Sequence, residues 1–305
     1  MSIPTQGVVP PVVIARHPDG TLDSESYAKN LQRLIDAGVH GLFILGSSGE
    51  GAFATNTERE QIISETMDVV DGRLPVLVGC IDTQTARVIE QVKVAERYGA
   101  DGVVVTAPFY ALGGMAQVEN HFRAIHEASE LPVFAYDIPV CVHTKLPVEM
   151  LVRLGSEGVL AGVKDSSGDD VSFRNLVLAN RAAGHPLALF TGHEVVVDGA
   201  YLAGADGCVP GLGNVDPHAY VRQWAAFQAG DWDTVREEQD RLADLMLVAR
   251  LATSVAGFGC GVGGFKTALQ LLGVFESNTM PAPVTALNAQ ETEAVRQVLK
   301  ANELL

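Results

Sequence analysis

The chain has 305 residues, of which 47% are hydrophobic and 19% are charged, and its formal net charge at pH 7 is −16. This composition supplies enough apolar material for a large core and excludes an intrinsically disordered chain. The negative charge argues against nucleic acid or an anionic membrane as a partner, so a small anionic substrate would need a local electropositive site.

The cysteines and the N-terminal segment indicate a soluble, cytoplasmic protein. Cys80, Cys141, Cys208 and Cys260 lie far apart without a CxxC pair, so we expect neither a disulfide framework nor a zinc knuckle. Residues 1–11 lack the basic region and apolar stretch of a signal peptide. No apolar run approaches the ~20 residues that a membrane helix needs.

Short apolar runs alternate along the chain with longer segments of helical period. Because the runs are apolar throughout, they are typical of strands buried on both faces, as in a parallel sheet. The predicted strands are residues 7–15, 41–46, 75–80, 102–107, 132–138, 159–165, 187–192 and 207–212. Between the first two, Tyr27, Leu31, Leu34 and Ile35 recur at the spacing of one apolar helix face.

Eight strands with helices between them match the count of a (β/α)8 barrel. A doubly wound sheet also alternates strand and helix, but it would normally have fewer strands and a nucleotide-binding motif after the first. Here the first strand runs into residues 16–23, which contain no such motif. The sequence therefore predicts an α/β fold, a (β/α)8 TIM barrel, over residues 1–229.

Helical patterns without strands follow the eighth predicted strand. They indicate the eighth barrel helix and a C-terminal helical extension, residues 230–305, packed on the barrel. The helical segments are residues 216–231, 233–254, 265–273 and 291–304.

A glycine-rich stretch and the histidines do not predict a cofactor or metal. Residues 259–264 fit GxGxxG, but they follow a helix rather than a strand, so we interpret them as a flexible turn that could lie over the barrel mouth. The histidines are scattered, and only His143 and His193 fall near the expected upper face. Metal dependence would need converging histidine and carboxylate ligands.

The C-terminal ends of barrel strands are where the catalytic residues of this fold lie. The second strand leads into Gly46-Ser47-Ser48-Gly49-Glu50. Glycines let backbone N–H groups turn inward and the two hydroxyls add donors, so this turn could hold a carboxylate or phosphate without a basic side chain. An ordinary Ser/Gly turn is the alternative.

Tyr136 and Lys164 fall at the ends of the fifth and sixth predicted strands. A neutral amine in a dry barrel can condense with a ketone to an imine, which draws electrons from the adjacent carbon and permits carbon–carbon bond formation or cleavage. A phenol nearby can relay protons. The alternatives are a structural ion pair or a surface position for Lys164, and an amphipathic core role for Tyr136.

With these motifs in order, the chain resembles the dihydrodipicolinate synthase and N-acetylneuraminate lyase superfamily, the pyruvate-dependent class I aldolases. The resemblance rests on Gly46–Glu50, Tyr136–Pro139 and Gly162–Asp169, and it extends over nearly the whole chain. The family usually has two threonines in the first motif and an asparagine after the tyrosine, where this chain has serines and Asp137.

The resemblance implies a role for each motif residue. Lys164 would form a Schiff base with C2 of pyruvate or another 2-oxo acid, and Tyr136 would shuttle protons. Ser47 and Ser48, in one turn with Gly49, would hold the substrate carboxylate.

Two further positions are implied in the same way. Tyr110 matches a tyrosine that the family lends across a dimer interface, and Val209 matches the position whose carbonyl faces the imine. The resemblance also implies a lyase without a cofactor, and a homotetramer built as a dimer of dimers.

One departure concerns the substrate. The synthase proper has an arginine five residues after the motif tyrosine, where it meets the second substrate's carboxylate, and this chain has Cys141 there. A thiol cannot replace a guanidinium fork. The departure favours an aldolase or dehydratase for a 2-oxo-3-deoxy sugar acid over the synthase. His143, Lys145 or His193 could contact the distal part of such a substrate, or be simple rim residues.

A non-catalytic module that binds a small oxo acid is the alternative of another class. Lys164, Tyr136 and the paired serines together favour catalysis, because a sensor has no need of all of them.

Overall fold

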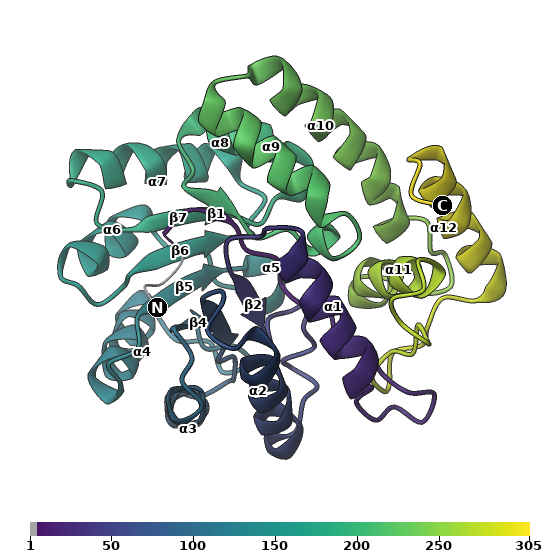
Figure 1. The fold of residues 1–305 in the computed structure, drawn as a ribbon. Coiled ribbons are helices and arrows are strands. Elements are labelled where there is room, and N and C mark those ends of the chain that lie inside the picture. The colour runs from purple at the N-terminus through teal and green to yellow at the C-terminus, as the bar shows by residue number, and fades with distance from the viewer. Residues whose placement is uncertain (1–4) are drawn as a thin grey trace.

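The computed structural model describes residues 5–305; residues 1–4, part of the N-terminal segment considered above, lie outside them. Parallel strands form one sheet in the order β1-β8-β7-β6-β5-β4-β3-β2 (Figure 1). The strands are β1 Gly7–Val8, β2 Leu42–Ile44, β3 Val76–Gly79, β4 Gly102–Thr106, β5 Val133–Asp137, β6 Gly162–Asp165, β7 Ala188–Thr191 and β8 Gly207–Cys208.

The segment that follows β1 closes the sheet against β2. The Val12 N–H donates to the Phe43 carbonyl at 2.8 Å, and the Phe43 N–H donates to the Pro10 carbonyl at 3.0 Å. The regular strand ends at Val8, well before the end of the predicted run, because Pro10 and Pro11 have no N–H for a ladder. The closed sheet confirms the predicted (β/α)8 barrel.

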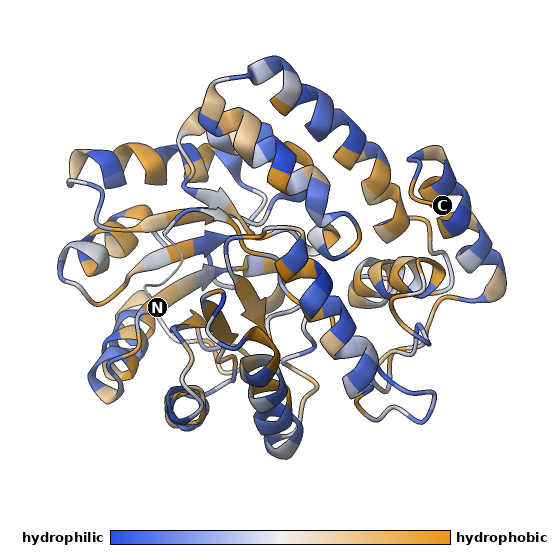
Figure 2. Ribbon diagram, viewed as in Figure 1, coloured by the Kyte–Doolittle hydropathy of each residue, from blue (hydrophilic) through white to orange (hydrophobic). Residues whose placement is uncertain are grey.

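Helices cover the outside of the barrel (Figure 1). In Figure 2 orange predominates in β2 to β4, and β5 and β6 turn blue at their C-terminal ends, whereas the helices carry blue on one side, as expected for elements that pack one face on a core. The helices are α1 Ser24–Asp36, α2 Asn56–Val70, α3 Thr85–Arg97, α4 Met115–Ala128, α5 Pro139–Val142, α6 Val148–Ser156, α7 Asp170–Ala182, α8 Val197–Ala203, α9 Pro217–Ala229, α10 Trp232–Leu245, α11 Phe258–Leu271 and α12 Ala289–Ala301, with 3-10 turns at η1 Glu194–Val196, η2 Gly211–Asn214 and η3 Met246–Ala249. None of the helices within residues 5–305 is long and apolar enough to cross a membrane.

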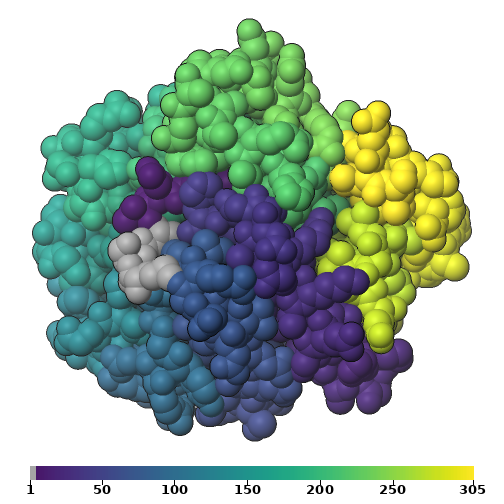
Figure 3. Space-filling model, viewed as in Figure 1, coloured from purple at the N-terminus to yellow at the C-terminus, as the bar shows by residue number. Residues whose placement is uncertain are grey.

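Helices α10 to α12 form the C-terminal extension and lie at one side of the barrel (Figure 3). α10 packs on α9, where Gln223 Nε2 donates to Gln239 Oε1 at 3.0 Å. At the other end, Lys29 of α1 donates to the Gly273 carbonyl at 2.6 Å. α9 ends at Ala229 and α10 begins at Trp232. A division into domains after residue 229 stays a prediction.

The glycine-rich stretch 259–264 is helical, and the prediction of a flexible turn is wrong. α11 begins at Phe258 and runs through all six residues. A Cβ added to Gly264 would lie 2.1 Å from the Val248 carbonyl oxygen, and one added to Gly263 would lie 2.8 Å from Leu287. The helix accepts glycines, each costing about 1 kcal/mol relative to alanine, because its backbone packs directly against η3 and the loop before α12.

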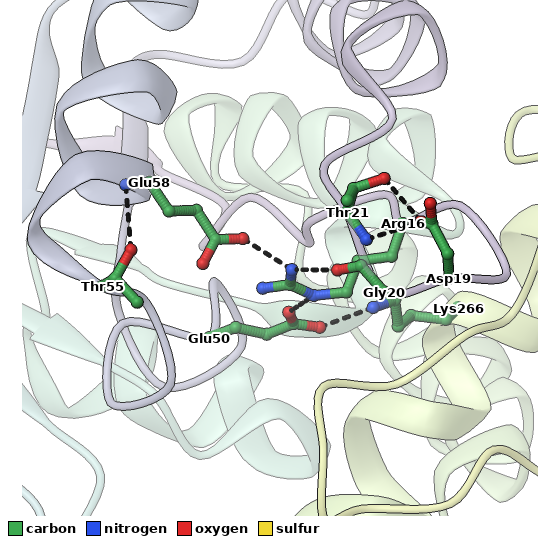
Figure 4. A network of polar contacts seen from close by, with 8 residues as sticks. All are labelled: Arg16, Asp19, Gly20, Thr21, Glu50, Thr55, Glu58 and Lys266. Carbon is green, nitrogen blue, oxygen red and sulfur yellow. Dashed lines mark hydrogen bonds and ion pairs between the residues drawn. The ribbon is translucent and has the colours of Figure 1, made fainter.

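A network of buried charges connects α11 to the turn after β2 (Figure 4). Glu50 lies between Arg16, at 2.6 Å, and Lys266, at 2.5 Å. The side chains of Glu50 and Lys266 are fully buried, and that of Arg16 is 4% exposed. Burial lowers the pKa of Lys266, and the charge of Glu50 opposes this effect. Removal of one partner from such a buried group typically costs about 3–5 kcal/mol.

The same turn is also packed tightly against β3. Leu45 has a φ of 55°, and Cβ atoms added to Gly51 and Gly79 would lie only 2.0 and 2.2 Å from the Leu45 carbonyl oxygen. Arg59, from α2, donates to the carbonyls of Gly51 and Gly79 at 2.9 and 2.8 Å. The turn after β2 is therefore fixed on two sides. The helix that follows the turn, α2, begins at Asn56, and the Thr55 side chain caps it by accepting from the Glu58 N–H.

Gly79→Ala should destabilise the barrel by about 1–3 kcal/mol, because the new methyl group meets backbone that cannot rotate away. Urea unfolding measures the change. Gly199→Ala is the matched control, since its Cβ would meet no heavy atom within 4 Å and the residue is in helix α8. Equal losses of stability in the two variants would contradict this account of the turn.

Candidate active site

The register of β5 and β6 brings the two principal candidates together. Tyr136 lies opposite Lys164, and Asp137 lies opposite Asp165. Successive side chains of a strand point to opposite faces. Tyr136 and Lys164 therefore share one face of the sheet, and the two aspartates share the other.

Lys164 lies at the centre of the barrel, among aromatic rings. The residue is 6% exposed, and its Nζ is 3.9 Å from the centroid of the Tyr136 ring and 5.0 Å from that of Phe43. A small apolar cavity of about 10 Å³ lies beside it, lined by Val9, Phe43, Leu77, Val104, Phe134, Lys164, Phe190 and Val209. The alternative of a surface lysine is excluded by this burial.

The two carboxylates nearest to Lys164 in the sheet, those of Asp137 and Asp165, pair with a different lysine. Asp137 and Asp165 both form ion pairs with Lys145, the latter at 3.6 Å. Burial raises the pKa of Asp137, and the hydrogen bond and charge of Lys145 oppose the rise. Within residues 5–305, Lys164 itself forms no ion pair, so the alternative of a structural pair is also excluded.

Ser47 joins this pair from the turn after β2. The Ser47 hydroxyl lies 3.2 Å from the Tyr136 hydroxyl, and the Tyr136 ring meets Phe43 edge to face. Lys164, Tyr136 and Ser47, which are far apart in the sequence, are therefore brought to one place.

Residues 46–50, which we call the carboxylate turn, present unused backbone donors. The Glu50 N–H donates to the Ser47 carbonyl at 3.2 Å, and the Gly51 N–H donates to the Gly46 carbonyl at 3.1 Å. Within the described chain, no hydrogen bond uses the N–H groups of Ser47, Ser48 or Gly49. Consecutive free N–H groups of this kind suit an anion.

An apolar cavity of about 190 Å³ lies above the carboxylate turn. It is lined by Gly46, Ser47, Ala52, Phe53, Ile81, Thr106, Phe109, Ile138, Cys141, Val142 and Phe258. None of these side chains carries a full charge. Phe258 comes from α11 and meets Phe53 with ring centroids 5.0 Å apart, so the C-terminal extension forms part of the wall.

Comparison with known proteins now identifies the family. The profile of the dihydrodipicolinate synthetase family matches residues 4–302. An uncharacterised DapA-like lyase of Halobacterium salinarum is 34% identical over 95% of this chain and 91% of its own length. The 4-hydroxy-tetrahydrodipicolinate synthase of Thermotoga neapolitana is 28% identical over 96% of this chain and 97% of its own.

A solved structure agrees with these relatives. YagE, a prophage protein of this family from E. coli K12 solved in complex with pyruvate, superposes with a TM-score of 0.92 and 28% identity over 98% of this chain and 99% of its own.

The chain belongs to the dihydrodipicolinate synthetase family. The predicted family, barrel fold and lyase class are thereby confirmed.

Thr106, beside the candidate site, was missed by sequence reasoning. Thr106 ends β4, lines the large cavity, and has a buried hydroxyl without a hydrogen-bond partner among the described residues. Its position at a strand end was the available signal. Glu194, in η1 after β7, accepts from the Leu212 N–H at 2.7 Å. Burial raises the pKa of Glu194 to about 7, opposed by backbone hydrogen bonds and by the charge of Lys164.

Of the other predicted residues, Val209 lies beside Lys164, and Tyr110, Lys145, His143 and His193 line neither cavity. Val209 is buried and lines the small cavity beside Lys164. Tyr110 is 93% exposed and lines neither cavity, so a single chain does not bring it to Lys164. Lys145 is engaged by the two aspartates, and His193 Nδ1 lies 3.1 Å from Asp170. His143 is exposed at the end of α5.

One group of side chains outside this site has metal-ligand chemistry. Potential ligand atoms of His17, Asp23 and Glu276 lie within 4.8 Å of one another, but His17 and Glu276 are exposed. None of the three lines either cavity of the barrel mouth. We assign the group no part in the lyase site.

The raised pKa of Glu194 predicts that ionisation of this residue lowers the stability of the folded protein as pH rises. Because the folded-state pKa exceeds the ordinary value of 4.5, ionisation opposes folding as pH rises from about 4.5 to about 7. Glu194→Gln should therefore gain about 1–3 kcal/mol of stability relative to wild type between pH 5 and pH 8. Urea unfolding at both pH values measures this, with Glu237→Gln on the exposed side of α10 as the control. A pH-independent difference for Glu194→Gln would contradict the assignment.

Proposed function

We propose that the chain is a pyruvate-dependent class I lyase in which Lys164 forms a Schiff base with the keto carbon of pyruvate or a 2-oxo-3-deoxy acid. The observation that supports it most strongly is the burial of the Lys164 amine 3.9 Å from the Tyr136 ring, without an ion-pair partner among residues 5–305. The solved YagE structure, which holds pyruvate, supports the same substrate class.

The reaction follows from the chemistry of an amine and a ketone. The neutral Lys164 amine adds to C2, the resulting carbinolamine loses water, and the protonated imine withdraws electrons from C3 and C4. In the cleavage direction the C3–C4 bond breaks, its electron pair moves toward the imine, and the C4 hydroxyl loses its proton to leave an aldehyde. Protonation of the enamine at C3 and hydrolysis release pyruvate and the free lysine.

Tyr136 and Ser47 would move the proton of the C4 hydroxyl. Their hydroxyls are 3.2 Å apart, which permits direct transfer between them. Tyr136 is 2% exposed, so its hydroxyl has little direct contact with bulk water.

The carboxylate turn would bind the C1 carboxylate. Ser47, Ser48 and Gly49 offer N–H groups that no other group in the described chain uses, and the serines add hydroxyls. This arrangement holds an anion with dipoles instead of a cation. An added cation close to Lys164 would disfavour the protonated imine, so binding by dipoles is compatible with the chemistry.

The large cavity bears on the second fragment of the substrate. Its lining has no charged side chain, and Cys141 stands where the synthase proper has an arginine. An uncharged aldehyde fits this lining, whereas a carboxylate would be desolvated without a partner. Thr106 supplies one free hydroxyl for a substrate oxygen. The features favour cleavage of a 2-oxo-3-deoxy acid whose aldehyde fragment is neutral.

The proposed assembly is a cytoplasmic homotetramer. Tyr110, Leu112 and Met115 are 93%, 55% and 40% exposed in one short segment, and a second copy that covered them would bring Tyr110 to its partner's site. Val171 and Leu202, on the adjoining helices α7 and α8, are 73% and 65% exposed and offer a second contact for a dimer of dimers. All four cysteines are free, as in a reducing compartment.

Borohydride reduction in the presence of pyruvate should trap a pyruvyl group on Lys164, because reduction converts the reversible imine to a stable amine. Mass spectrometry of the digested protein locates the group. Lys164→Ala should give no adduct, while Lys300→Ala, at an exposed position of α12, should behave as wild type. Tyr136→Phe should keep the adduct but lose about 10²–10⁴-fold in turnover. A folded wild-type protein without an adduct would refute the proposal, and an adduct without turnover of any substrate would favour a binding module.

A panel of 2-oxo-3-deoxy acids, assayed for pyruvate release, should show turnover of those that yield an uncharged aldehyde. Condensation of pyruvate with aspartate semialdehyde should be slower by about 10–100-fold than turnover of the best acid in the panel, because no guanidinium receives the carboxylate of the semialdehyde. An equal or faster reaction with the semialdehyde would contradict the inference that Cys141, in place of an arginine, disfavours a second substrate with a carboxylate.

A further inference from the structure

Glu50, the last residue of the carboxylate turn, is held by two cations from outside the turn. Arg16 Nε lies 2.6 Å from Glu50 Oε2, and Lys266 Nζ lies 2.5 Å from Glu50 Oε1, so each oxygen has its own partner (Figure 4). Glu50 also has a φ of 56°, an unusual conformation for a residue with a side chain. Its strained backbone is therefore stabilised through the side chain.

The cations come from parts of the chain that are far apart. Arg16 follows β1, whereas Lys266 lies in α11 of the C-terminal extension. Arg16 also bonds to Glu58 at 2.6 Å, and to the Gly20 carbonyl at 2.8 Å. Two cations and two carboxylates leave the network neutral, so it has no spare charge to attract a substrate. What it can do is fix the position of Glu50.

The position of Glu50 sets the position of the turn's donors. Its N–H closes the turn on the Ser47 carbonyl at 3.2 Å, and the N–H groups between them, those of Ser48 and Gly49, are unused within the described chain. A shift of Glu50 would therefore rotate these groups, and the Ser47 hydroxyl that lies 3.2 Å from Tyr136. Lys164 is on another strand, β6, and its position does not depend on the turn in the same way.

We propose that Lys266 and Arg16 are positioning residues for substrate binding: through Glu50 they hold the carboxylate turn in the conformation that receives the C1 carboxylate. The inference rests on the proposed function of this turn. It makes the C-terminal extension part of the substrate site, because Lys266 belongs to α11. Loss of the network should weaken the binding of a 2-oxo acid while leaving the amine able to react with a ketone.

A neutral ketone separates these two effects. Pyruvate and hydroxyacetone both offer a carbonyl to Lys164, but only pyruvate has a carboxylate for the turn. Borohydride trapping on Lys164 is measured against the concentration of each compound in wild type, Lys266→Met and Lys300→Met. Lys300 is the matched control, since it is an exposed lysine of the same extension.

In Lys266→Met, the pyruvate concentration for half-maximal trapping should rise by about tenfold or more. The hydroxyacetone concentration for half-maximal trapping should stay the same as in wild type. Lys300→Met should match wild type with both compounds. Lys266→Met leaves a buried charge uncompensated, so a second variant, Lys266→Met with Glu50→Gln, restores neutrality because Arg16 and Glu58 remain paired. The double variant should recover stability in urea but not pyruvate binding.

Each other outcome overturns a defined part of the argument. Equal weakening for both ketones, or a double variant with wild-type pyruvate binding, would make the network purely structural and overturn this inference alone. Trapping of hydroxyacetone but not pyruvate by wild type would overturn the assignment of the carboxylate turn. A wild-type protein that traps neither compound would overturn the proposed function, and this inference with it.

Discussion

The face of the sheet to which Lys164 points decides everything else in the site. Strand alternation sends Lys164 and Tyr136 into the barrel, and sends Asp137 and Asp165 to the opposite face, where Lys145 pairs with both. A shift of β6 by one residue would exchange the places of Lys164 and Asp165 and give the barrel a carboxylate in place of an amine. The amine is thus kept among aromatic rings, and the charges of the neighbouring residues are satisfied outside.

The C-terminal extension is closely connected to this arrangement. Phe258 and Lys266 lie at the start and middle of α11, and one lines the large cavity while the other anchors Glu50. The helix comes this near because Gly264 has no Cβ to meet the Val248 carbonyl. Packing, cavity shape and the buried charge network therefore depend on the same helix, although it lies outside the ring of strands.

The sequence was sufficient for the barrel and for the strand-end residues, because each strand is a continuous apolar run and its C-terminal end is the next polar residue. Lys164, Tyr136 and Ser47 were found in this way. Thr106 also ends a strand, but it was missed because Ala107 continues the apolar run beyond it. Phe258 could not be found, since its place in the cavity wall depends on how α11 folds back over the barrel mouth. Residues 259–264 were misjudged because glycine at a close helix contact has the same local pattern as glycine in a turn.

The most direct test of the central claim is the exchange of the pyruvate methyl protons in D₂O, followed by NMR. An imine at Lys164 acidifies these protons, so wild type should replace them with deuterium well above the uncatalysed rate, and folded Lys164→Ala should not. Exchange at the background rate in wild type, or at an undiminished rate in Lys164→Ala, would contradict the claim that this buried amine activates the substrate.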